Sequence, residues 1–74
     1  MRVTVKLFAS FRAGRFVEAA GDYAPGARIA EVIDALGIKA PDVGIIMMDG
    51  RHATAERVLH DGARLSLFPL LGGG

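Results

Sequence analysis

The sequence has no cysteine, and charged residues of neither sign are in marked excess. Without cysteine the chain has no disulfide bond, no thiolate zinc site and no cysteine nucleophile. Nine lysines and arginines stand against eight aspartates and glutamates, so the net charge is only +1. Because these charges are scattered along the chain, they do not form the cluster of basic residues that is typical of nucleic-acid binding. Composition therefore argues against a nucleic-acid partner and against cysteine-based chemistry.

Long hydrophobic runs are also lacking. The longest runs, such as "GIIMM", are far shorter than the roughly 20 residues needed to cross a bilayer, and the opening "MRVTVKLFAS" lacks the apolar stretch of a signal peptide. We therefore expect a soluble cytoplasmic protein with no membrane partner. With 74 residues, the chain is expected to be a single domain of marginal stability, with little room for an elaborate active site.

Alternating hydrophobicity predicts the first strand. Over "MRVTVKLFA", the apolar residues Val3, Val5 and Leu7 alternate with polar ones, as in a strand that is buried on one side. Phe8 falls on the polar side of this pattern. After "FRAG", the segment "RFVEAA" from Arg15 predicts a weaker strand that forms a hairpin with the first.

An amphipathic helix of about three turns is predicted for "ARIAEVIDALG". Its apolar residues are spaced i, i+3, i+4 and i+7, which places them on one face. They are Ile29, Val32, Ile33 and Leu36. Gly37 stands where a left-handed C-cap would end the helix.

Two Asp-Gly dipeptides divide the rest of the chain. The run "VGIIMM" predicts a buried strand, with Met47 and Met48 in the core. The first dipeptide, at 49–50, predicts a tight turn into a short strand that begins at Arg51. The second, at 61–62, predicts a turn before a last strand, "ARLSLF".

The order of elements predicts an α+β fold, with one main helix packed on one face of a mixed sheet. In the last strand, Leu65 and Leu67 share one side, whereas Phe68 lies opposite with the polar residues. If the first and last strands are neighbours, Phe8 and Phe68 come together on the open face. A contiguous apolar patch of this kind is typical of a partner-binding site.

Three stretches, "VTVKLFASFR", "GARIAEVIDALG" and "DGARLSLFPLLGGG", carry a likeness to a known family. With these three stretches in this order, the sequence resembles the ThiS/MoaD family of ubiquitin-like sulfur carriers, and most of all the small subunit of molybdopterin synthase. It departs from that branch in ending with three glycines and in lacking a second proline. The resemblance implies a β-grasp, ubiquitin-like domain at 1–68 and a flexible Gly-Gly tail at 69–74.

The resemblance also implies a carrier that binds no cofactor and catalyses nothing itself. A ubiquitin-activating-type adenylyltransferase would use ATP to adenylate Gly74, and a sulfur donor would convert it to a thiocarboxylate. The sulfur would then be transferred to a pterin precursor held by the large subunit of molybdopterin synthase. Gly73 and Gly74 have no Cβ to obstruct a narrow channel, and from Leu70 onward an extended tail spans about 17 Å. The residues expected to contact partners are Phe8, Phe68, Pro69, Leu70, Leu71 and Gly72.

Several alternatives stay open. The chain could be the sulfur carrier for thiamine thiazole biosynthesis, a protein modifier joined through Gly74 to lysines, or a binding module whose terminus is simply frayed. The apolar lead-in "LFPLL" favours a working terminus over a frayed one. His52 and His60 are expected to be exposed turn residues rather than metal ligands. Arg12 could meet an acidic partner surface, but by default it is expected to be a solubilising loop residue.

Overall fold

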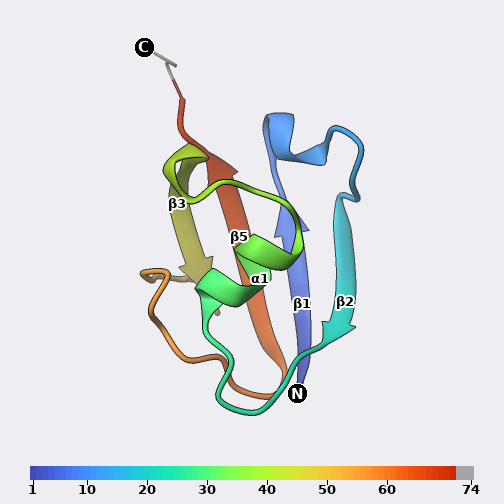
Figure 1. Ribbon diagram of the computed structural model, residues 1–74, viewed down its shortest axis with the longest axis vertical. Helices are drawn as coiled ribbons and strands as arrows, with labels where there is room; N and C mark the ends of the chain where they lie inside the picture. The colour runs from blue at the N-terminus through green and yellow to red at the C-terminus, as the bar shows by residue number, and fades with distance from the viewer. Residues whose placement is uncertain (72–74) are drawn as a thin grey trace.

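The computed structural model describes residues 1–71, which form a five-stranded mixed sheet with an α-helix across one face (Figure 1). The strands are β1 (Arg2–Leu7), β2 (Glu18–Asp22), β3 (Val43–Met48), β4 (Arg51–His52) and β5 (Ala63–Pro69). The α-helix is α1 (Ile29–Ala35), and two short 3-10 helices are η1 (Ala9–Arg12) and η2 (Ala40–Asp42). The predicted α+β class is confirmed.

The two strands farthest apart in the sequence lie side by side in the sheet. The strand order is β2-β1-β5-β3-β4, and β1 runs parallel to β5. Val3 pairs with Ala63 at the start of this ladder, and Leu7 pairs with Leu67 at its end. β2 is antiparallel to β1, and β3 is antiparallel to β5. The parallel pairing brings the end of β5 to the same edge of the sheet as the end of β1 (Figure 1).

The core lies between α1 and the inner face of the sheet. It contains the alternating residues predicted for the first and last strands and most of the predicted helical stripe, all at most 3% exposed. These residues are Val3, Val5, Leu7, Ile29, Val32, Ile33, Leu65 and Leu67. No polar or charged residue among those described is buried, so the apolar contacts carry this core. Among residues 1–71, no helix has the length and apolar character needed to cross a bilayer.

The helix α1 has seven residues, about two turns rather than the predicted three. Its start is set by the loop before β5, because Arg28 forms an isolated antiparallel bridge with Val58 and is held extended. The first helical N–H, that of Ile29, donates to the carbonyl of Arg57 at 3.0 Å. At the other end Gly37 has a φ of +72°, as predicted for the C-cap.

Two strands differ from their predictions. β2 begins at Glu18 instead of Arg15, and the Arg15 side chain reaches the carbonyl end of α1, where its Nε donates to the oxygen of Leu36. β3 is a strand but not a buried one. Its residues alternate between faces, so that Met48 is buried while Ile45 is 44% exposed. The prediction that Met48 belongs to the core is confirmed, whereas Met47 is only half-buried.

Candidate functional site

The outer face of the sheet carries a stacked aromatic pair. Leu7 and Leu67 are paired and both point into the core, so the following residues, Phe8 and Phe68, both point outward. The ring centroids of Phe8 and Phe68 are 4.1 Å apart and the ring planes differ by 13°. Both rings are half-buried. The prediction that these two residues are neighbours on the open face is confirmed.

Two cations flank the Phe8 ring. The Nζ of Lys6 lies 5.3 Å from the ring centroid, and the guanidinium carbon of Arg12 lies 5.5 Å from it, both within cation–π range. The Nε of Arg12 also donates to the carbonyl of Leu7 at 2.8 Å. Arg12 is therefore more than the solubilising loop residue that was predicted, because it fixes η1 to the end of β1 beside the aromatic pair.

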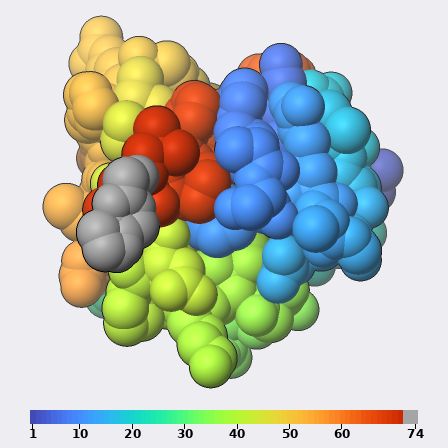
Figure 2. All heavy atoms as spheres, turned by 90° about the horizontal axis from the view of Figure 1, so that it is seen from above, coloured from blue at the N-terminus to red at the C-terminus, as the bar shows by residue number. Residues whose placement is uncertain are grey.

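An apolar hollow of about 290 Å³ opens beside the two rings. Its walls come from the end of β1, the start of β3 and the end of β5. Figure 2 shows the end of β5, in red, beside the segment that follows β1, in blue. The lining residues are Phe8, Ala9, Gly44, Ile45, Phe68, Pro69, Leu70 and Leu71. Leu70 is 62% exposed and Leu71 is 79% exposed. We call this set of residues the apolar hollow.

Exposed large apolar side chains are otherwise scarce on the described part of the chain. Five are found there, and Ile45, Leu70 and Leu71 of these five line the apolar hollow. Single exposed apolar residues are ordinary, but a contiguous group around a concavity marks an interaction surface. The predicted partner-binding residues that can be placed, from Phe8 to Leu71, all lie in this group. Ile45 and Gly44 belong to it as well and were not predicted.

The C-terminal segment leaves the sheet at the rim of the apolar hollow. β5 ends at Pro69, and the N–H of Leu70 donates to the carbonyl of Asp42 at 2.8 Å. The predicted contact residue Gly72 and the predicted reactive residues Gly73 and Gly74 lie outside the described residues.

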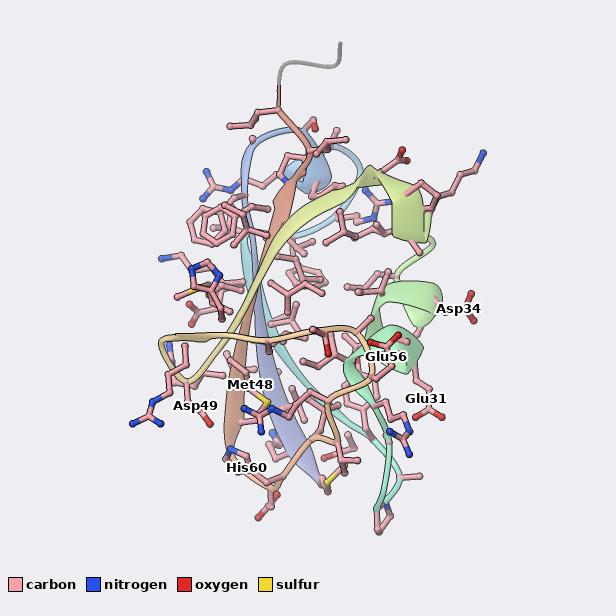
Figure 3. The ribbon with its side chains drawn as sticks, turned by 90° about the vertical axis from the view of Figure 1, so that its left-hand side faces the viewer. Glu31, Asp34, Met48, Asp49, Glu56 and His60 are labelled. Carbon is pink, nitrogen blue, oxygen red and sulfur yellow. The ribbon has the colours of Figure 1, made fainter. Side chains whose placement is uncertain are left out.

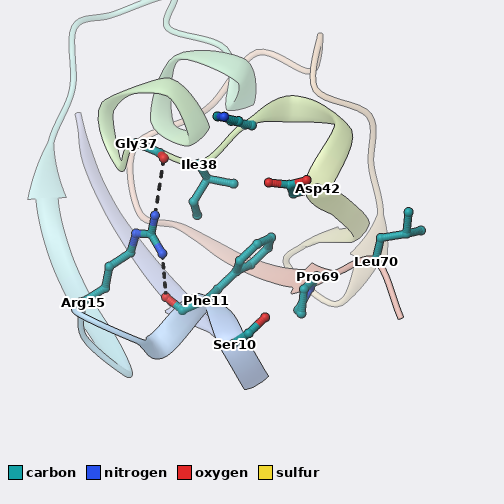
Figure 4. Close-up of a pocket in the computed structure, with 9 residues that line it drawn as sticks. Ser10, Phe11, Arg15, Gly37, Ile38, Asp42, Pro69 and Leu70 are labelled. Carbon is teal, nitrogen blue, oxygen red and sulfur yellow. Dashed lines mark hydrogen bonds between the residues drawn. The ribbon is translucent and has the colours of Figure 1, made fainter. Parts of the chain in front are cut away.

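A larger groove of about 860 Å³ lies on the other side of Pro69, between η1 and the end of α1 (Figure 4). The Arg15 guanidinium that projects into it is engaged by the carbonyls of Phe11, Leu36 and Gly37. These bonds join η1 to the carbonyl end of α1, where a cation is favourable. Because this charge is used to hold the fold together, the smaller apolar hollow is the better candidate site.

His60 and Asp49, labelled in Figure 3, form an ion pair near the start of β5, where Asp49 also accepts from the N–H of Arg64. The Nε2 of His60 is 2.5 Å from a carboxylate oxygen of Asp49, and its Nδ1 is 2.9 Å from the carbonyl oxygen of Asp61. Only the imidazolium can donate from both nitrogens. The hydrogen bond between the two side chains raises the pKa of His60 and, aided by the N–H of Arg64, lowers the pKa of Asp49.

This ion pair is a structural feature remote from the apolar hollow. His60 is exposed, as predicted, but its partner was not predicted, and His52 is exposed in β4. Within residues 1–71, no three side chains of His, Asp or Glu lie close enough together to hold a metal ion.

Solved structures share this fold. A putative molybdopterin converting factor, subunit 1, from Pyrococcus furiosus is 28% identical, with a TM-score of 0.76 over 93% of this chain and 97% of that chain. Small archaeal modifier protein 1 of H. volcanii is 22% identical, with a TM-score of 0.74 over 92% of this chain and 95% of that one. A chain in the protein-protein complex of subunits 1 and 2 of the molybdopterin-converting factor from Helicobacter pylori is 21% identical, with a TM-score of 0.66 over the whole of both chains.

These likenesses confirm the predicted β-grasp, ubiquitin-like fold and the resemblance to the ThiS/MoaD family. No curated protein matches the sequence significantly. The sequence profile described as Mut7-C ubiquitin matches residues 4–72, from the middle of β1 to a point beyond the end of β5. The chain therefore belongs to the Mut7-C ubiquitin family.

Proposed function

We propose that this chain is a sulfur carrier whose C-terminal carboxylate, at Gly74, is activated and converted to a thiocarboxylate for molybdopterin biosynthesis. The observation that carries the proposal is the position of the C-terminal segment. It leaves β5 at the rim of the apolar hollow, so a partner that covers Phe8 and Phe68 also meets the chain at Leu70. The likeness to the putative molybdopterin converting factor subunit from Pyrococcus furiosus supports the same pathway.

The chemistry belongs to the partners. A free carboxylate is a poor electrophile, so an adenylyltransferase joins the Gly74 carboxylate to the α-phosphorus of ATP, which forms the acyl-adenylate and releases pyrophosphate. A persulfide sulfur of the donor then attacks the carbonyl carbon and displaces AMP. A thiol reductant cleaves the resulting acyl disulfide, leaving the thiocarboxylate on the carrier and a disulfide between the donor and the reductant.

The carrier contributes docking and delivery. The stacked rings and the apolar hollow offer a preformed contact surface, and aromatic residues in such a surface are typical binding anchors. Lys6 and Arg12 beside Phe8 favour acidic groups on the facing partner surface. The three terminal glycines have no Cβ, which suits passage through a narrow channel to the adenylation site. The chain itself carries no catalytic role, and the proposed acceptor of the sulfur is a pterin precursor held by the large subunit of molybdopterin synthase.

The test is mass spectrometry of the intact chain after incubation with the activating enzyme, ATP, a persulfide donor and a thiol reductant. We expect the oxygen-to-sulfur mass increment on the C-terminal fragment. A chain with one bulky residue appended through a protease site should fold normally and gain no sulfur. Cleavage that regenerates the free Gly74 should restore the increment, which makes the same sample its own control. We expect Gly73→Val to reduce the increment, because a β-branched residue stiffens the backbone and fills the channel.

Each of the other possible functions gives a different result in this experiment. Isopeptide adducts to lysines in place of the thiocarboxylate would identify a protein modifier. Transfer of sulfur to the enzyme of thiazole formation, but not to molybdopterin synthase, would identify a thiamine carrier. If the extended chain gained sulfur as readily as the free one, or if no C-terminal fragment ever gained it, the sulfur-carrier proposal would be wrong.

A further inference from the structure

The start of β3 touches the backbone of the C-terminal segment. The ladder between β3 and β5 pairs Ile45 with Phe68 and then Val43 with Pro69, so Gly44 is an extra residue in a bulge. Proline has no N–H to donate, and the next donor along the chain, the N–H of Leu70, bonds to the carbonyl of Asp42. The chain from Phe68 to Leu70 is thus held on both sides of the bulge, by Ile45 on one side and by Val43 and Asp42 on the other.

Glycine is required at position 44 because of the available space. A Cβ built on Gly44 would lie 2.9 Å from the Cα of Leu70, 2.9 Å from the carbonyl oxygen of Pro69 and 3.1 Å from the N of Leu70. All three are backbone atoms, so no rotation of a side chain can relieve the contact. Gly44 is not among the glycines with positive φ, such as Gly50 and Gly62 in the turns, so its backbone conformation is open to any residue.

We infer that Gly44 is a positioning residue, which lets the backbone at 69–70 lie directly on β3 and so fixes where the chain leaves the sheet. This inference rests on the proposed function, in which the terminal carboxylate is the reacting group. Gly44 also lines the apolar hollow beside Phe68. The docking surface and the backbone at Pro69 and Leu70 therefore keep a fixed spatial relation, so a partner that binds the hollow meets the chain where it leaves β3.

The direct test is amide hydrogen exchange, measured by NMR on the free chain carrying Gly44→Ala. A methyl group at this site should push the segment from β3 and break the bond to Asp42, so we expect the N–H of Leu70 to exchange about tenfold faster or more. The amide of Leu67, in the central ladder, should keep its protection. The matched control is Gly21→Ala in β2, where a Cβ would meet the Tyr23 ring at an ordinary 3.5 Å.

Two results of this exchange experiment would overturn the inference. One is unchanged exchange at Leu70, which would mean that the methyl group is accommodated without moving the segment. The other is loss of protection throughout the core, Leu67 included, which would mean that the sheet opens rather than the segment moving.

The functional readout is the rate at which the activating enzyme turns over the carrier. For Gly44→Ala we expect kcat to fall by about 10- to 100-fold with a smaller change in KM, because misplacing a reacting group affects the chemical step. Phe68→Ala should instead raise KM. An unchanged kcat for Gly44→Ala, or a change confined to KM, would contradict the positioning role. If the unmodified chain gains no sulfur at all, the proposed function fails, while the exchange of the Leu70 amide still decides whether Gly44 places the segment.

Discussion

Phe68→Ala separates docking from folding more sharply than other substitutions in this chain. The Phe68 ring is half-buried, stacks on Phe8 and packs on the outer face of the sheet. Removing it from the free chain loses the stacking contribution, about 0.5–1.5 kcal/mol, and part of the burial of one ring. The preceding residue, Leu67, is 0% exposed and points to the core, where truncation to alanine costs about 2–5 kcal/mol. We therefore expect Phe68→Ala to destabilise the fold less than Leu67→Ala does.

The effect of Phe68→Ala on binding should be larger than its effect on folding. Truncating an aromatic anchor at the centre of an interface costs about 1–3 kcal/mol, which is roughly a 5- to 150-fold increase in Kd. Titration calorimetry with the activating enzyme and with the synthase large subunit measures the binding change, and denaturant unfolding of the free chain measures the folding change. Leu67→Ala, from the same strand and the opposite face, is the matched control.

Two outcomes would refute this reasoning about Phe68. If Phe68→Ala left both affinities unchanged, the stacked pair would not be part of the docking surface. If Phe68→Ala lowered the free energy of unfolding as much as Leu67→Ala, the ring would belong to the core, and any loss of binding would follow from loss of the fold.

Two further predictions concern the core and the pH dependence of stability. Ile33→Ala should lower the free energy of unfolding by about 2–5 kcal/mol because Ile33 is only 3% exposed. In a chain this small the variant should be largely unfolded. A cooperative denaturant transition close to that of the parent would contradict the place of Ile33 in the core. The pKa of His60 is raised above its ordinary 6.5. The stabilisation that comes from protonated His60 should therefore be lost as pH rises above 6.5 and through the raised pKa. The pKa of Asp49 is lowered below its ordinary 3.8, so the stabilisation should also fade as pH falls through the lowered pKa. Urea unfolding of the parent and of His60→Gln over this pH range tests both signs, and an identical pH dependence in the two chains would mean that the pair contributes nothing.

The inner face of the sheet was predictable because it follows local periodicity. Alternation fixed the orientation of Leu7 and Leu67, and with it the outward direction of Phe8 and Phe68, whose pairing needed only the assumption that the first and last strands are neighbours. Gly37 marked the end of α1 correctly because a left-handed cap is a local property.

What was missed depends on contacts between distant segments. A bulge at Gly44 has no signature in "VGIIMM", because the glycine is needed only where the backbone near Leu70 approaches it. Because nearly every residue of this run is apolar, the sequence did not reveal that the side chains of β3 alternate between the two faces of the sheet, with Ile45 facing outward. Likewise, periodicity gave no sign of the 3-10 turn η1, of its buried Phe11, or of the contact between Arg15 and the end of α1, which joins residues more than twenty positions apart.

The parallel ladder between β1 and β5 has a consequence for how the protein is made. Val3 pairs with Ala63, and β1 leaves the ribosome well before β5, so β1 has no central neighbour until β5 has been synthesised. Contacts of such long sequence separation are slow to form, because the loop between them must close first. A nascent chain that stalls before β5 lacks the middle of its sheet and exposes the apolar side of β1 to chaperones and proteases. The strand that completes the fold, β5, is followed directly by Leu70 and Leu71. Folding of the sheet therefore also brings these two residues to the apolar hollow, the proposed docking surface.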